Sequence, residues 1–275
     1  MKLAIPIFDG GKIYNEVEIK KPKTGVIASV YEIADRGNVF RAMVEFVARC
    51  IESITSMDGD IIEEPNAIKR LCGSMPYLSA EAIALRVMAL INEDDTVEGV
   101  YKCPRCGNKV MTEYDEILDI DTRDRISELE IVCLEEADYN NRIPVELEES
   151  VKITNSNTKE VLEEINSFEI RYPTMKDCII SANNMIEGQE VRVQIKIYIN
   201  SLITVNGNPV DKKWISTWGA VLFRNTSPVD LAQIGNKLRS YGLKKTAERT
   251  CNKCGKVWNA PINTSNFFVS GLQPT

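Results

Sequence analysis

The sequence contains no histidine among its 275 residues. This absence excludes Ser-His-Asp and Cys-His nucleophilic sites and removes the commonest general base of enzymes. It also leaves no imidazole to ligate a catalytic zinc ion, so a zinc site in this chain must be made of thiolates and be closed and structural. The sequence likewise shows no nucleophile–base pair and no phosphate-binding loop. We therefore predict a protein that is not an enzyme and that has no small-molecule substrate.

Long apolar runs are also missing. None approaches the roughly 18 residues that a membrane span requires, and the apolar part of residues 1–11 is too short for a signal peptide. We therefore expect no membrane partner and a cytoplasmic location by default. With 44% hydrophobic and 27% charged residues, the composition is that of a globular protein. A chain of this length is long enough for two ordinary domains.

The eight cysteines are of two kinds. Four form two Cys-x-x-Cys-Gly motifs, at 103–107 and 251–255, and four are scattered. In a cytoplasmic chain, paired cysteines are metal ligands more often than disulfides. The glycine after each pair suits a tight turn that directs backbone N–H groups at sulfur. The scattered thiols fit small buried apolar side chains: Cys50, Cys72, Cys133 and Cys178.

Together, the two motifs supply the four thiolates of a tetrahedral site. We predict one structural Zn²⁺ per chain, held by Cys103, Cys106, Cys251 and Cys254.

The gap between the two motifs points to a duplication. A compact zinc ribbon separates its cysteine pairs by roughly 15–20 residues, whereas here a domain's length of chain lies between them. Several landmarks recur at that same spacing of 148 residues: Gly59 and Gly207 in turn motifs, Ser79 and Ser227 at expected helix starts, and both cysteines of each motif. Pro22 and Pro173 match at a spacing of 151. Each copy would then carry half of a zinc site. The halves could meet between neighbouring chains, but we favour closure within one chain.

The predicted fold class is α+β, with two related, mostly helical repeats that contain short strands and are joined by the split four-cysteine zinc ribbon. The first repeat covers residues 1–112, an acidic connector covers 113–165, and the second repeat covers 166–275. Hydrophobic periodicity and turn signals predict strands over 2–8 and 15–20, and helices over 26–34, 39–56, 64–72, 79–92 and 174–186. Ser79, followed by Glu81, is the expected N-cap of the helix over 79–92. The second repeat ends in Phe267-Phe268, which we expect to dock into the chain's own core or a partner's groove.

Charge is distributed unevenly. The net charge is −7, but residues 166–275 carry 14 Lys and Arg against 7 Asp and Glu. The stretch 113–150 is strongly acidic, with interleaved apolar residues that indicate structure. The basic part could face an acidic partner, including nucleic acid. Two solvated faces that complement each other within an assembly are the simpler interpretation.

The order of these motifs has a known parallel. An Ile/Val-rich opening strand, a proline break and helices lead to the first Cys-x-x-Cys-Gly. A second strand, an Asn-Gly loop and the second Cys-x-x-Cys-Gly then precede a closing Asn-Phe-Phe: Pro173-Thr174, Asn206-Gly207 and Asn266-Phe267-Phe268. This order resembles the baseplate central hub proteins of T4-like contractile-tailed bacteriophages, the small hub assembly subunit in particular. The region before Cys103 also resembles the tail assembly chaperones of contractile phages.

The resemblance implies a structural or assembly protein of a phage tail. Its partners would be other tail and baseplate proteins, including hub and tail tube components. Its location would be the virion baseplate and, during assembly, the host cytoplasm. The zinc ligands implied are the four paired cysteines. The alternative is a nucleic-acid-binding zinc-ribbon protein, which the basic residues around the motifs favour. An overall pI of about 5.0 argues against nucleic acid as a partner.

Overall fold

The computed structural model describes residues 1–35, 39–91, 95–97, 100–111, 114–115, 120–121, 124–155, 158–183 and 190–262. The predicted Phe267-Phe268 ending and parts of the acidic stretch lie outside these ranges. Within them, no helix combines the length and apolarity needed to cross a bilayer.

The first unit is a four-stranded antiparallel sheet with four helices. Its strands pair in chain order: β1 (Lys2–Asp9), β2 (Lys12–Ile19), β3 (Ile51–Ser56) and β4 (Ile61–Ile62). Two helices connect β2 to β3 and two follow β4: α1 (Thr24–Asp35), α2 (Val39–Cys50), α3 (Pro65–Ser74) and α4 (Tyr77–Ile91). The β1–β2 turn uses Gly10 and Gly11 at φ 57° and 78°, a conformation that a Cβ would make costly.

The second unit repeats this order. Its antiparallel sheet again pairs in chain order: β12 (Ile143–Thr154), β13 (Val161–Ile170), β14 (Leu202–Val205) and β15 (Asn208–Pro209). Its helices occupy the same places in the chain order: α5 (Met175–Ala182), α6 (Glu190–Ser201), α7 (Lys212–Asn225) and α8 (Pro228–Arg239). Side-chain caps start three of them, because Thr174, Asp211 and Ser227 each accept a backbone N–H of the first turn.

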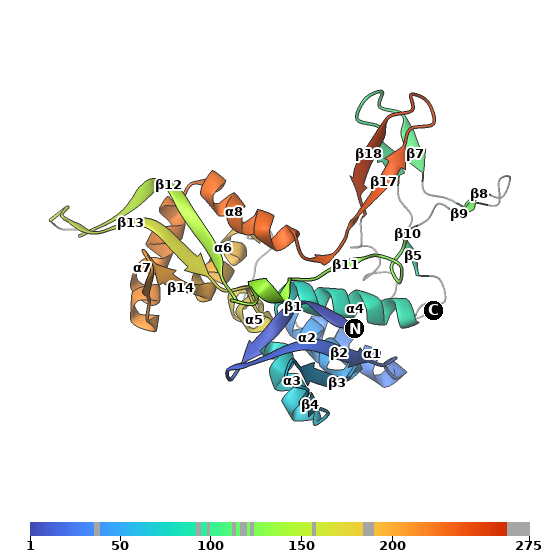
Figure 1. Ribbon diagram of the computed structural model, residues 1–275, viewed down its shortest axis with the longest axis horizontal. Helices are drawn as coiled ribbons and strands as arrows, with labels where there is room; N and C mark the ends of the chain where they lie inside the picture. Colours follow the sequence, from blue (N-terminus) through green and yellow to red (C-terminus); the bar gives the residue numbers. More distant parts are fainter. Residues whose placement is uncertain are drawn as a thin grey trace.

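A hairpin with a cysteine motif in its turn follows each unit. The first consists of β6 (Val100–Lys102) and β7 (Lys109–Met111), the second of β17 (Thr246–Thr250) and β18 (Val257–Pro261). The two hairpins stand side by side and project away from the two units (Figure 1).

The register between the two units changes along the chain. It is the expected 148 residues at the turn glycines Gly59 and Gly207, which have φ of 87° and 75°, but it differs at several helices and strands. The starts of α1 and α5, of β3 and β14, and of α4 and α8 are 151 residues apart, whereas the cysteines are 148 apart. Ser227 is the N-cap of α8, but Ser79 lies inside α4, whose first residue is Tyr77. The prediction that Ser79 caps this helix is therefore wrong. Its structural counterpart is Asp230.

The prediction of mostly helical repeats is also wrong. Antiparallel sheets organise both units, and their longest strands have 8 residues in the first unit and 12 in the second. The helix expected over 39–56 ends at Cys50, and the rest forms β3. Tertiary pairing explains this difference, because β3 lies between β2 and β4 and buries Ile51 and Ile54.

The segment that we expected to be an acidic connector, 113–165, contributes β12 and half of β13 to the second sheet. The second unit therefore includes strands before residue 166. Earlier parts of the segment pair with strands that flank the cysteine hairpins. β10 (Asp124–Arg125) pairs with β5 (Thr96–Val97), and β11 (Ile131–Val132) pairs with β16 (Gly242–Leu243). Two other short strands pair with each other, β8 (Tyr114–Asp115) and β9 (Ile120–Asp121). One 3-10 turn, η1 (Glu136–Asp138), precedes β12.

Two apolar cores exchange residues across the junction of the units. Met175 of the second unit is fully buried in the first core, and Ile5 of the first unit is fully buried in the second. Residues before α4 and before α5 lie antiparallel here, with a β-bridge between Pro76 and Thr174. The N–H of Met175 donates to the carbonyl of Met75 at 2.9 Å. The two units therefore share a packed interface.

Candidate metal centre

The structure brings the four predicted ligands together. Their Sγ atoms all lie within 4.8 Å of one another. Cys103 and Cys106 come from the β6–β7 turn, and Cys251 and Cys254 come from the β17–β18 turn. Cys103 and Cys251 are 2% and 1% exposed, whereas Cys106 is exposed and Cys254 is half-buried. Four convergent thiols from two hairpins form a metal-binding group, because thiolates prefer soft or borderline metal ions in tetrahedral geometry.

Both turns have the same backbone design. The N–H of Gly107 donates to the carbonyl of Cys103 at 2.9 Å, and that of Gly255 donates to Cys251 at 2.8 Å. Gly107 and Gly255 have φ of 69° and 67°, the left-handed conformation that glycine adopts without a Cβ clash. The sequence predicted this role for both glycines. Because the two turns have the same hydrogen bond and the same glycine conformation, each positions its two cysteines in the same way.

Backbone N–H groups of each turn are directed at its first sulfur. Burial alone raises the pKa of the Cys251 thiol, but the N–H groups of Cys254 and Lys253 donate to its sulfur and lower the pKa to about 6. The same balance holds at Cys103, where burial is outweighed by the N–H groups of Cys106 and Arg105 and the pKa is lowered. These donors stabilise the thiolate form that a metal ion requires.

Cys254 behaves differently. The N–H of Lys256 favours its thiolate, but burial and the three neighbouring sulfur atoms oppose this and raise the pKa of Cys254 to about 11. Four thiolates this close repel one another unless a cation lies among them. A bound cation would therefore stabilise the four thiolates of the cluster.

The two turns are related by an approximate twofold axis. Cys103 Sγ lies 3.7 Å from Cys254 Sγ, and Cys106 Sγ lies 3.6 Å from Cys251 Sγ. Exchanging the two motifs converts one of these contacts into the other, so the contact is isologous. The Asn108 side chain also donates to Asn252 Oδ1 at 2.8 Å, across the two turns. The hairpins thus form a self-complementary pair.

Ion pairs, a cation–π contact and an apolar contact join the second hairpin to the first hairpin, to β10 and to the first unit. Arg249 of β17 lies over the Tyr101 ring at 5.0 Å and forms a salt bridge with Asp124. Before β17, Lys245 Nζ lies 2.6 Å from Glu81 of α4, and Ile262 after β18 is buried in the first core. Basic residues of the chain's second half therefore pair with acids of its first half.

The scattered cysteines are separate from this centre. Cys50, Cys72 and Cys178 are buried, which confirms the prediction for these three, and Cys133 is half-buried. Burial raises the pKa of each of the three buried thiols to about 12. They are packing residues that stay protonated.

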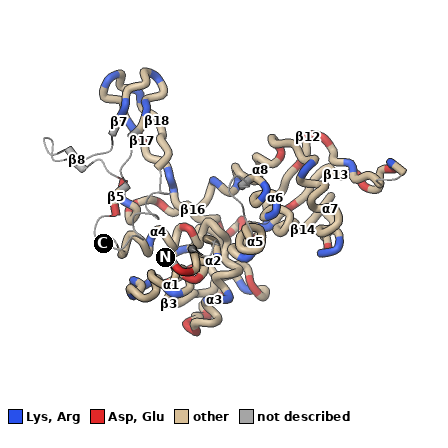
Figure 2. The backbone as a smooth tube through the Cα atoms, turned by 180° about the vertical axis from the view of Figure 1, so that it is seen from behind, with Lys and Arg blue, Asp and Glu red and all other residues tan. Residues whose placement is uncertain are grey.

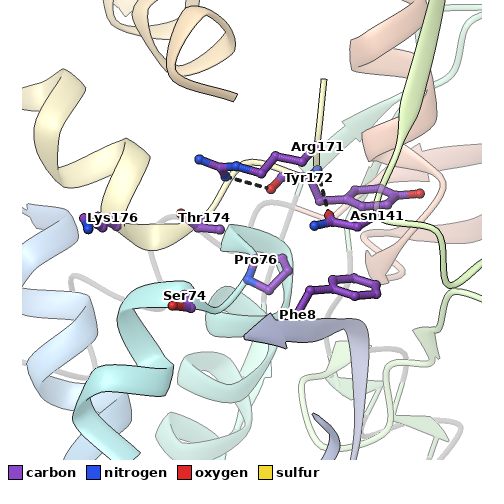
Figure 3. A pocket seen from close by; sticks show the side chains of 8 residues that line it. All are labelled: Phe8, Ser74, Pro76, Asn141, Arg171, Tyr172, Thr174 and Lys176. Atoms are coloured by element: carbon purple, nitrogen blue, oxygen red, sulfur yellow. Dashed lines mark hydrogen bonds between the residues drawn. The ribbon is translucent and has the colours of Figure 1, made fainter. Parts of the chain in front are cut away.

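A shallow hollow of about 170 Å³ lies at the junction of the units (Figure 3). Phe8, Ser74 and Pro76 line it from the first unit, with Asn141, Arg171, Tyr172, Thr174 and Lys176 on the other side. Arg171 is engaged there by Asp177, with N–O distances of 2.5 and 2.7 Å. No local pattern in the sequence indicates this junction, because its residues converge only through tertiary packing.

Comparison of the chain with protein-family models, with curated proteins and with solved structures finds no match.

Proposed function

We propose that the four cysteines bind one zinc ion per chain, as a structural clasp between the two units. A tetrahedral site with Zn–S bonds of about 2.3 Å has S–S edges of about 3.8 Å. The two contacts between the hairpins, 3.6 and 3.7 Å, are close to that length. Four thiolates would fill the coordination shell and leave no position for water or substrate. The site therefore supports folding and assembly.

We further propose that the chain is a structural or assembly protein of a contractile phage tail. It contributes to the baseplate hub through contacts with other tail and baseplate proteins, in the virion and in the host cytoplasm during assembly. The observation that carries the structural role is the closed four-cysteine centre between two duplicated units. The assignment to phage tails rests on the resemblance of the motif order to hub proteins.

Metal analysis tests the shared centre. We expect about one zinc per chain, and Cys103→Ser and Cys254→Ser should weaken zinc binding equally although they lie on different hairpins. Cys133→Ser is the matched control, because its thiol is remote in sequence and outside the cluster, and it should bind zinc as the native chain does. Two independently filled half-sites, or purified protein without metal, would contradict the clasp.

The gene's neighbourhood tests the assignment to a phage tail separately. Tail tube, tape measure and baseplate genes are expected beside it. Adjacent genes for an unrelated cellular process would contradict the tail assignment and leave the zinc clasp standing.

Nucleic-acid binding is the second candidate, because Lys and Arg residues lie along the tips of the two hairpins (Figure 2). Four of them are exposed beside the cysteines: Arg105, Lys109, Lys253 and Lys256. Phosphate binding by such a cluster would fall steeply with rising salt. Fluorescence anisotropy with labelled DNA and RNA should reveal it at low salt. Absence of binding there would exclude this candidate.

A further inference from the structure

The two units of this chain meet by unlike surfaces. The first unit contributes the α3–α4 junction, Met75–Tyr77, which we call a head. The second contributes the residues that lead into α5, Pro173–Met175, which we call a tail. Three backbone contacts join them: the Pro76–Thr174 bridge, Tyr77 N–H to the Pro173 carbonyl at 3.0 Å, and Met175 N–H to the Met75 carbonyl at 2.9 Å.

Because the units are alike, each also has the surface that the other uses. The head of the second unit is Thr226–Pro228, between α7 and α8, and the tail of the first unit is Pro22–Thr24, before α1. A contact between unlike surfaces is heterologous, and it leaves one copy of each surface at the two ends. The hairpin contact is isologous and closes on itself. Only the head-to-tail contact can therefore be continued.

Side chains that the junction covers in one unit are uncovered in the other. Leu78 packs against the second core, whereas its counterpart Val229 is 61% exposed. Within the first unit, Phe40 packs edge-on against Tyr77 of the head with ring centroids 6.0 Å apart, whereas its counterpart in the second unit, Val191, is 69% exposed. Exposure of this kind beside a helix junction marks an apolar surface that no other part of the described residues covers.

The free tail shows the same contrast. Ile179 of α5 packs against the first core, while its counterpart on α1, Ala28, is exposed. Figure 1 places α1 and α7 at opposite ends of the two units. One chain's free tail and free head are thus too far apart to meet each other, and are available to other molecules.

The charged residues beside the two free surfaces are mostly of opposite sign, and Arg224, exposed two residues before the free head, is the basic exception. Exposed lysines surround the free tail: Lys20, Lys21 and Lys23. Exposed glutamates line β12, the strand on which α8 packs beside the free head: Glu146, Glu148 and Glu149. Gln233 and Asp230 of α8 hydrogen-bond to the backbone of this strand, at 2.8 and 3.2 Å. Complementary charge favours and orients docking between the two ends.

We propose that the free head binds the free tail of a second copy of this chain, so that copies associate head to tail into a ring or an open filament. The occupant is a second copy because the contact already exists once within the chain, between equivalent elements. The proposal rests on the duplicated fold and does not depend on the proposed role in phage assembly.

Sedimentation and light scattering of the zinc-loaded full chain test it. The mass should rise above one chain as concentration increases, either to a fixed multiple for a ring or continuously for a filament, and high salt should weaken the association. A single-chain mass up to about 1 mM protein would overturn the proposal.

Two variants and their mixture establish the direction. Val229→Lys places a positive charge on the head, opposite the lysines of the tail, and Ala28→Glu places a negative charge on the tail, opposite the glutamates of the head. Each variant alone should be a single chain. An equal mixture should associate into particles of at least two chains, because the native head of the Ala28→Glu variant can bind the native tail of the Val229→Lys variant.

Val161→Lys, at a position 49% exposed on β13, is the matched control and should associate as the native chain does. Lys21→Glu with Lys23→Glu is a second tail variant, which keeps the test valid if Ala28→Glu unfolds α1. Head-to-tail docking would be overturned if the head and tail variants associated as the native chain does, or if the particles in the mixture each contained a single chain.

Discussion

Ser79 and Asp230 are equivalent residues of the two units, and both hold the first strand of a sheet against a helix. Each is the third residue of its helix and is almost fully buried. Ser79 Oγ accepts the N–H of Ile5 at 2.8 Å, and Asp230 Oδ1 accepts the N–H of Glu148 at 3.2 Å. The same helix position has therefore kept the same hydrogen-bonding task with a different side chain.

The first prediction concerns Ser79→Ala. It removes the acceptor of a buried N–H, and Ser79 Oγ also donates to the Ile5 carbonyl at 2.7 Å. An unpaired buried group costs about 1–3 kcal/mol, so the free energy of unfolding in urea should fall by that amount. Ser216→Ala, whose hydroxyl bonds to Lys213 on the exposed side of α7, should change it by less than about 0.5 kcal/mol. Equal effects of the two changes would contradict the assigned role.

This pair also shows what the sequence could reveal. The cysteine spacing revealed the duplication and the four residues of the centre, because thiol pairs and Cys-x-x-Cys-Gly turns are local signals. The register within each unit was less visible. Serines at 79 and 227 align by identity, but the structural match is Ser79 with Asp230, because a hydrogen bond and not a residue type is what the two units share.

Sheet content was underestimated for a related reason. Periodicity alone extended the helix over 39–56, since Ile51 and Ile54 continue the apolar spacing. Strand pairing with β2 ends the helix at Cys50, which only tertiary context decides. The acidic composition of 113–150 similarly hid β12, whose exposed face carries glutamates while Val145, Val151 and Ile153 are buried.

The second prediction concerns the pair of Arg171 and Asp177 at the unit junction. The Asp177 side chain is 6% exposed and also accepts the N–H of Thr174 at 2.8 Å. Arg171→Ala should cost about 2–4 kcal/mol of unfolding free energy, because it leaves a buried carboxylate without its counter-charge. Adding Asp177→Asn should recover part of this loss, since the amide keeps the cap without the charge.

A double-mutant cycle in urea measures this coupling. Arg142→Ala is the control, because its pair with Glu169 is more exposed, at 51% and 27% for the two side chains, and should cost less than about 1 kcal/mol. If Asp177→Asn made the Arg171→Ala variant less stable still, the charge explanation would fail.

The third prediction concerns alkaline pH and the buried thiol of Cys72. Burial raises its pKa to about 12, whereas a thiol in the unfolded chain titrates near 8.5. A raised native pKa contributes stability that is fully present below the unfolded pKa and is lost as pH rises towards the native one. Between pH 8 and 10 the native chain should therefore lose about 1–2 kcal/mol that Cys72→Ala does not lose.

Urea unfolding under reducing conditions at both pH values checks this. The difference in free energy of unfolding between the native chain and Cys72→Ala should become smaller as pH rises. Val47→Ala also removes a fully buried side chain but has no titrating group, so its gap should stay constant. A gap for Cys72→Ala that is independent of pH would show that the thiol ionises equally in both states.

The last prediction concerns the turn glycines of the proposed zinc centre. Gly107→Ala and Gly255→Ala each place a Cβ on a residue with φ near 70°, a conformation that costs an L-residue about 1–2 kcal/mol. Because the turn must keep this conformation to direct N–H groups at sulfur, zinc affinity should fall about 5–30-fold. Zinc affinity should fall equally in the two alanine variants, since the two turns have the same geometry. It should fall less in Gly107→Asn, because asparagine tolerates positive φ.

Competition with a chelator of known affinity measures these changes. Gly73→Ala is the matched control: Gly73 lies in α3 without positive φ, and an added Cβ meets no atom within 4 Å. That variant should bind zinc as the native chain does and be slightly more stable, because alanine favours the helix. A Gly107→Ala variant with native affinity would mean that the turn can hold its cysteines without the left-handed glycine. A loss at Gly107 alone would mean that the two hairpins do not share the metal symmetrically.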